Sequence, residues 1–235
     1  MTITPVPTEA QTDPKRLVVL SAGTGNPSST RQLADAVARK SLDLLRSAGT
    51  PATVAVIELG PLAADTARAA VAGFPGEEVQ EVIDRLAEAD AVIVATPVYK
   101  AGISGLLKTF VDILDNDLLV AKPVLLAATG GTARHALVID DQMRPLFAFM
   151  RALTAPTSVY AAPEDWGSTE LGARIERAAT ELAALVHAGV EERVADRAWG
   201  SYQHEFAGNA RRAERTADDI DFDSPLMRLA AGGRS

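Results

Sequence analysis

Short apolar runs alternate along this chain with segments whose apolar residues recur at helical spacing, and this alternation restricts the possible folds. Short runs rich in β-branched residues are typical of buried strands in parallel sheets. Strands that alternate with helices build a sheet covered by helices on both faces. We therefore expect an α/β fold with a doubly wound, five-stranded parallel sheet of order 2-1-3-4-5. The expected strands lie at 16–20, 52–57, 91–95, 122–128 and 157–161.

The length of 235 residues suits one such domain with extensions at its ends. Residues 1–14 hold three prolines and are expected to form a mobile N-terminal arm. The α/β domain is expected at 15–188. Residues 189–235 are expected to form a partly helical C-terminal extension. Disorder is expected for its last third. The alternative is that four apolar side chains dock on a groove of a neighbouring subunit: Phe222, Leu226, Met227 and Leu229.

Composition excludes several classes of function. The net charge of −8 and the pI near 5.0 argue against nucleic acid and anionic membranes as partners, because no excess of cations is present to neutralise phosphates. The chain has no cysteine, and its three histidines lack metal-ligand spacing, so no disulfide, thiol catalyst or metal site is expected. No secretory signal and no apolar run of about 20 residues is visible, so we expect a cytoplasmic protein.

A loop of small residues follows the first expected strand and reads Ser-Ala-Gly-Thr-Gly-Asn-Pro-Ser-Ser-Thr over 21–30. Glycines let the backbone approach a ligand, hydroxyls donate hydrogen bonds, and the N-terminus of the next helix attracts anions. The loop matches neither a Walker motif nor Gly-x-Gly-x-x-Gly, so a mononucleotide phosphate is the better hypothesis. A capped helix after a tight turn, without ligand, is the alternative. The candidate phosphate-binding residues are Ser21, Ser28, Ser29 and Thr30.

Two further loops follow the third and fourth expected strands. Pro97 biases the residue before it towards extended backbone, and Ser104 is a favourable N-cap for a helix that continues to Leu114. The third loop reads Thr-Gly-Gly-Thr-Ala-Arg-His over 129–135. In a sheet of order 2-1-3-4-5, the carboxyl ends of strands one, three and four bring these loops to one place, where ligands bind.

The loop sequences resemble those of the NADPH-dependent FMN reductase family, which has the flavodoxin-like fold. Thr96-Pro-Val-Tyr-Lys100, followed by Ser104-Gly105 and Leu107-Lys108, resembles the second flavin loop of that family. Gly130-Gly-Thr132, with His135, Asp140 and Arg144-Pro145, resembles its third loop and the helix after it. The resemblance extends over about residues 15–187.

This resemblance implies hydride transfer from nicotinamide C4 to flavin N5, with FMN and NADPH or NADH as cofactors and no catalytic side chain. It implies that Pro97, Val98, Tyr99 and Lys100 line the flavin ring and ribityl chain. It also implies that Gly130, Gly131 and Thr132 border the pyrimidine side.

The expected partners also follow from the resemblance. They are free flavin, a nicotinamide nucleotide, a flavin-dependent monooxygenase that consumes the reduced flavin, and copies of this chain in a homodimer or homotetramer. The segment 104–114 is a candidate subunit interface.

The chain departs from the family at two positions. Gly25 stands where members commonly carry arginine, which shifts phosphate binding to hydroxyls and backbone amides. Ile103 stands where some members place an aromatic residue, so their distortion of the following helix is not expected here. Two alternatives stay open: a flavodoxin-type electron carrier, which Thr24-Gly25-Asn26 resembles, and a quinone or azo reductase with tightly bound FMN. The choice between NADPH and NADH is also open.

Overall fold

The computed structural model describes residues 13–194. Nearly all of the expected N-terminal arm lies outside this range. Most of the expected C-terminal extension does too, including the four apolar side chains for which docking was the alternative to disorder.

The sheet has the expected order. Its main strands are β1 (Lys15–Ser21), β2 (Ala52–Glu58), β3 (Ala91–Tyr99) and β5 (Pro123–Thr129), which pair in parallel. The strand order is β2-β1-β3-β5-β6, and β7 also pairs with β5. These observations confirm the flavodoxin-like order 2-1-3-4-5.

The fifth strand is divided into β6 (Leu153–Thr154) and β7 (Val159–Ala161), each parallel to β5. Pro156 lies between the two pieces and has no N–H to donate to the sheet. The amide and hydroxyl of Thr157 instead donate to the Glu181 carboxylate at 2.6 and 2.7 Å. The expected strand at 157–161 is therefore shorter, and a second piece precedes it.

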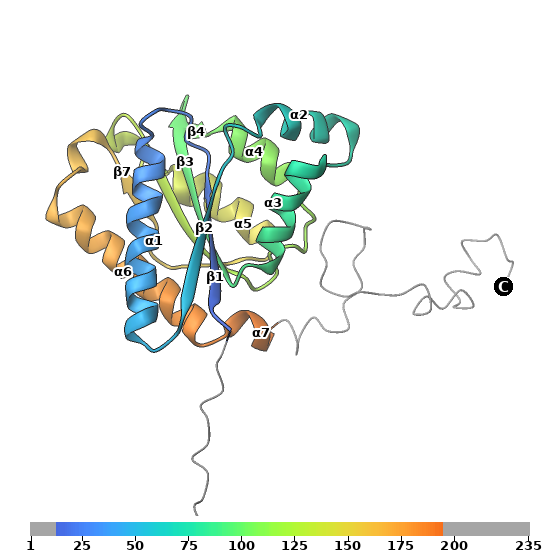
Figure 1. The fold of residues 1–235 in the computed structure, drawn as a ribbon. Coiled ribbons are helices and arrows are strands. Elements are labelled where there is room, and N and C mark those ends of the chain that lie inside the picture. The colour runs from blue at the N-terminus through green and yellow to red at the C-terminus, as the bar shows by residue number, and fades with distance from the viewer. Residues whose placement is uncertain (1–12, 195–235) are drawn as a thin grey trace, which may run out of the picture.

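Helices cover both faces of the sheet (Figure 1). One face carries α1 (Ser29–Ser47) and α6 (Thr169–His187), and the other carries α3 (Glu77–Glu88), α4 (Gly105–Asp112) and α5 (Arg144–Phe149). Helix α2 (Ala63–Ala72) packs against α4, and α7 (Val190–Val194) follows α6. The apolar stripes predicted from helical spacing form these two cores: Leu33, Val37 and Leu182 are buried in one, and Val79, Ile83 and Phe110 in the other.

The stretch at 136–153 is not one continuous helix, and its α-helix starts beside Pro145, where a proline is tolerated in the first turn. A 3₁₀ turn (Ala133–His135) and a π-helical turn (Ile139–Met143) precede α5, which begins beside Pro145. Helix α4 starts at the predicted N-cap, where Ser104 Oγ accepts a hydrogen bond from Leu106 N. Another 3₁₀ turn lies at Pro163–Asp165. Within residues 13–194, no helix is long and apolar enough to cross a membrane.

Candidate functional site

The three predicted loops meet at one cavity of about 310 Å³ at the carboxyl ends of β1, β3 and β5. Eight of the predicted site residues line it: Ser28, Ser29, Thr30, Pro97, Val98, Tyr99, Gly130 and Gly131. Further lining residues are Gly23, Thr24, Gly25, Pro27, Thr129 and Pro163. We call this space the three-loop cavity.

The first loop presents the start of α1 to the three-loop cavity. Ser28 is the N-cap: its Oγ accepts from Arg31 N at 3.2 Å and its carbonyl from Gln32 N at 3.0 Å. The first amides of a helix have no partner within the helix, so those of Ser29 and Thr30 remain for a ligand. A Cβ at Gly23 would lie 2.1 Å from Ser28 Oγ, so only glycine lets the loop fold this closely against the helix cap.

Hydroxyl groups of three residues fix the position of the first loop. Ser21 is fully buried, its Oγ lies 3.5 Å from Gly23 N, and it does not line the three-loop cavity. Thr30 Oγ1 and Thr129 Oγ1 lie 2.7 Å apart, which ties the start of α1 to the end of β5. The first and third loops are therefore held in a fixed relation.

The second loop is a tight hairpin in which β4 (Gly102–Ile103) pairs antiparallel with the end of β3. Lys100 and Ala101 form its two-residue turn, with φ values of 53° and 60°. Such turns favour Asn-Gly, and a left-handed conformation costs a residue with a Cβ about 1–2 kcal/mol. The amide of Gln142 clamps the hairpin: Nε2 donates to Ala101 O at 3.2 Å, and Oε1 accepts from Ile103 N at 3.1 Å.

Tyr99 and Lys100 are placed differently by this hairpin. Tyr99 lines the three-loop cavity, is 52% exposed, and its hydroxyl lies 3.4 Å from Thr24 Oγ1 across the first loop. Lys100 lies in the turn and does not line the cavity. The hairpin therefore offers an aromatic ring to a ligand and keeps the lysine at its tip.

The third loop is held by Tyr160 of β7. The Tyr160 hydroxyl donates to Thr132 O at 2.6 Å, and a Cβ at Gly130 would lie 2.2 Å from that hydroxyl. Burial raises the pKa of Tyr160, with a further contribution from Asp165 and Glu164, so the phenol stays a donor at neutral pH. Thr132 does not line the cavity, and its carbonyl instead anchors the loop.

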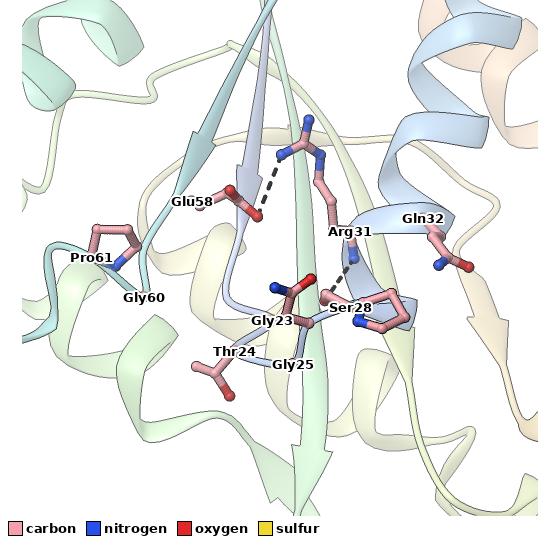
Figure 2. Close-up of a pocket in the computed structure, with 11 residues that line it drawn as sticks. Gly23, Thr24, Gly25, Ser28, Arg31, Gln32, Glu58, Gly60 and Pro61 are labelled. Atoms are coloured by element: carbon pink, nitrogen blue, oxygen red, sulfur yellow. Dashed lines mark hydrogen bonds and ion pairs between the residues drawn. The ribbon is translucent and has the colours of Figure 1, made fainter.

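Arg31 does not line the three-loop cavity, where a ligand of a bound phosphate would lie. Its Nε donates to Asp35 Oδ1 at 2.8 Å, and its Nη1 lies 3.4 Å from Glu58 Oε1. Figure 2 shows this guanidinium directed towards Glu58, in a second cavity on the β2 side of the first loop. The groups that the first loop presents to the three-loop cavity are therefore neutral hydroxyls and amides.

Sequence reasoning missed several residues that shape the site. Thr24 lies in the first loop, and its position between two glycines was a sequence signal that it lines the cavity. Neither Gln142 nor Tyr160 had one, because each acts through a contact with a distant loop.

The donor set fits a flavin mononucleotide. Hydroxyls and helix-start amides suit its phosphate, the hairpin supplies apolar and aromatic surface for a ring, and two glycines border the opposite side.

Comparisons with known proteins agree with this chemistry. The model of the NADPH-dependent FMN reductase family matches residues 15–167. An FMN reductase (NADPH) of Pseudomonas aeruginosa is 42% identical over 179 residues, which cover 74% of this chain and 94% of that protein. An NADH-dependent FMN reductase, SfnF, of Pseudomonas fluorescens is 41% identical over 177 residues, covering 73% and 92%.

A solved structure is also similar. An oxidoreductase of Corynebacterium diphtheriae matches with a TM-score of 0.73 and 42% identity, over 75% of this chain and 99% of that one. With the fold, the site and the sequence in agreement, the chain belongs to the NADPH-dependent FMN reductase family and is an NAD(P)H:FMN oxidoreductase.

Proposed function

We propose that FMN binds in the three-loop cavity and that the reduced flavin then leaves to supply a partner monooxygenase. The observation that carries the first part is the convergence of the three loops on one cavity. In this proposal Ser28, Ser29 and Thr30 hold the phosphate. Pro97, Val98 and Tyr99 face the ring and ribityl chain, and Gly130 and Gly131 border the pyrimidine. Ser21, Lys100 and Thr132 belong to the same loops but do not line the cavity. Ser21 and Thr132 keep their loops in place, and Lys100 lies in the hairpin turn.

The side chains of the site position the reactants. Bound FMN supplies the hydride acceptor, and the nicotinamide nucleotide supplies the hydride, so no nucleophile or strong acid is required. The Gln142 clamp holds Tyr99 at the mouth of the cavity, and the bond from Tyr160 to Thr132 fixes the third loop. These contacts keep both sides of the flavin site preorganised.

The neutral phosphate site supports the release of flavin. Hydrogen bonds to phosphate from charged donors are about twice as strong as those from neutral donors. Arg31 is the cation nearest in sequence to the loop, and its guanidinium pairs with Asp35 and Glu58. Weak phosphate binding favours exchange, which suits a flavin that is a substrate. In this proposal a flavin-dependent monooxygenase consumes the reduced product.

The test has two steps. NADH or NADPH oxidation is first measured with free FMN, and we expect saturable turnover that depends on added flavin. The reaction mixture is then reduced without oxygen and passed through a membrane that retains protein. Reduced flavin in the filtrate supports a diffusible product. Flavin that stays with the protein contradicts it and favours the carrier or the quinone and azo reductases.

We also propose that the chain forms a homodimer or homotetramer. Leu137 and Phe149 are 66% and 67% exposed, and burying them between subunits is favourable. The outward side of α4, the candidate interface at 104–114, carries an ion pair between Lys108 and Asp112. Light scattering on wild type and on Phe149→Ser tests this proposal: an oligomer that the substitution weakens supports it, and a monomeric wild type contradicts it.

A further inference from the structure

A second cavity of about 640 Å³ lies on the other side of the first loop, above the end of β2. We call it the β2-side cavity. Five residues of the first loop line both cavities, so one loop forms their common wall. The lining is completed by Asn26 of the same loop, by Glu58 at the end of β2 with Gly60 and Pro61 after it, and by Arg31 and Gln32 of α1 (Figure 2). The binding of FMN proposed above makes no use of this space.

Two charged residues of opposite sign line the β2-side cavity, Arg31 and Glu58, and Arg31 also pairs with Asp35 outside the lining. The hydrogen bond from Arg31 to Asp35 raises the pKa of the guanidinium, outweighing its partial burial, and Glu58 adds to the effect. Arg31 is thus one cation between two carboxylates. Glu58 is about half exposed, and its 3.4 Å separation from Arg31 Nη1 is longer than an ordinary hydrogen bond, so the carboxylate keeps lone pairs for a ligand.

The position of Glu58 in the fold indicates what kind of ligand it suits. Glu58 is the last residue of β2 and is in register with Ser21, the last residue of β1. In dinucleotide-binding βαβ units, the phosphates lie at the loop after the first strand. A carboxylate at the end of the second strand accepts hydrogen bonds from the ribose hydroxyls of the adenosine half. The unit from β1 through α1 to β2 shares with them the position of the carboxylate at the end of the second strand. Its loop lacks the Gly-x-Gly-x-x-Gly spacing, and its helix start is assigned above to the FMN phosphate.

We infer that the β2-side cavity binds the adenosine ribose of the nicotinamide nucleotide, with Glu58 accepting hydrogen bonds from its 2′- and 3′-hydroxyls. The inference rests on the proposed function, because the nicotinamide end must reach the flavin across the first loop. A phosphate at the 2′ position would meet the Glu58 carboxylate, and Arg31 is already paired with Glu58 and Asp35. The site therefore selects NADH over NADPH.

A titration without flavin tests this inference. ADP-ribose and its 2′-phosphorylated form are titrated calorimetrically into the flavin-free chain. We expect ADP-ribose to bind at least about tenfold more tightly than the 2′-phosphorylated form. In Glu58→Gln, we expect weaker binding of ADP-ribose, tighter binding of the 2′-phosphorylated form, and a difference between them that disappears or reverses. Steady-state kcat/KM for NADH and NADPH is expected to shift in the same direction.

The matched control is Glu88→Gln, which alters an exposed carboxylate paired with Arg16 at 3.0 Å, away from both cavities. This control is expected to keep the wild-type preference. Equal binding of the two ligands to wild type, no binding of either, or an unchanged preference in Glu58→Gln would each overturn the inference.

FMN binding is measured separately in each variant. Failure of the wild type to bind FMN contradicts the proposed flavin site, whereas failure of the ADP-ribose titration contradicts only the assignment of the β2-side cavity. The two failures are thus distinguishable.

Discussion

Polar groups at the amino end of the sheet bind one another, whereas those at the carboxyl end face cavities. At the amino end, Lys122 is fully buried, and its Nζ donates to the carbonyls of Ala87 and Ala89 and pairs with Glu191 at 3.0 Å. Lys15 lies nearby and pairs with Asp90 and Glu192 at 2.9 and 2.8 Å. At the carboxyl end, hydroxyls and helix-start amides face two cavities.

Because of this difference, we expect the amino end to determine the stability of the fold and the carboxyl end to determine ligand binding. The amino end satisfies its charges within the chain, and Glu191 and Glu192 of α7 close it (Figure 1). The carboxyl end keeps its donors for a ligand, and distant contacts such as that of Gln142 hold its loops. Substitutions at the amino end should therefore change the free energy of unfolding, and those at the carboxyl end should change ligand affinity.

The largest effect on stability is expected for Lys122→Met. The substitution leaves two buried carbonyls and Glu191 without this cation, and breaking a buried pair from one side costs about 3–5 kcal/mol. We expect the free energy of unfolding, from urea denaturation, to fall by about 3 kcal/mol. The FMN dissociation constant of the folded variant, from flavin fluorescence, should stay at the wild-type value. Weaker FMN binding without loss of stability would contradict the separation.

The largest effect on affinity is expected for Gly23→Ala. Its Cβ would clash with Ser28 Oγ and move the helix cap, so we expect the FMN dissociation constant to rise about tenfold or more, equivalent to about 1.4 kcal/mol. Flavin fluorescence measures it. The control Gly172→Ala lies in α6, where the added Cβ has open space beyond the backbone of its own helix. It should leave FMN binding unchanged and stabilise the fold by about 0.5–1 kcal/mol.

A smaller effect is expected for Tyr160→Phe, which removes the hydrogen bond to Thr132 O. One such bond contributes about 1 kcal/mol, so FMN should bind several-fold more weakly while the core stays packed. Because burial raises the pKa of Tyr160, the bond is complete below the ordinary tyrosine pKa of about 10. The hydrogen bond is lost as pH rises through the raised pKa of Tyr160. Wild-type FMN affinity should therefore show no Tyr160 titration between pH 6 and about pH 9. A titration in that range would contradict this role of Tyr160.

The smallest effect is expected for Ala101→Gly in the hairpin turn. Glycine adopts the left-handed conformation without the Cβ clash, so the fold should gain up to about 1 kcal/mol. The thermal midpoint of unfolding measures this gain. A loss of stability would show that the turn is not strained.

The sequence predicted the elements with strong local signals. The strand order followed from the apolar runs, and the helix cap at Ser104 followed from a hydroxyl placed before a helical pattern. The same signal placed the start of α1 among the hydroxyls at 28–30 without choosing the cap. The convergence of the three loops then followed from the topology.

Contacts between distant segments were not predictable in this way. Gln142 reaches a hairpin 39 residues earlier, and Tyr160 reaches a loop 28 residues earlier, so neither leaves a local pattern. The direction of Arg31 depends on Glu58 of a neighbouring strand. The division of the fifth strand had one local signal, Pro156.

The central claim is that the first loop binds the phosphate of FMN at the carboxyl end of the sheet. Its most direct test compares the dissociation constants of FMN and riboflavin, which differ only in that phosphate, by equilibrium dialysis with the wild-type chain. We predict that FMN binds about tenfold or more tightly than riboflavin, a difference of about 1.4 kcal/mol. Equal dissociation constants for the two flavins would contradict the claim.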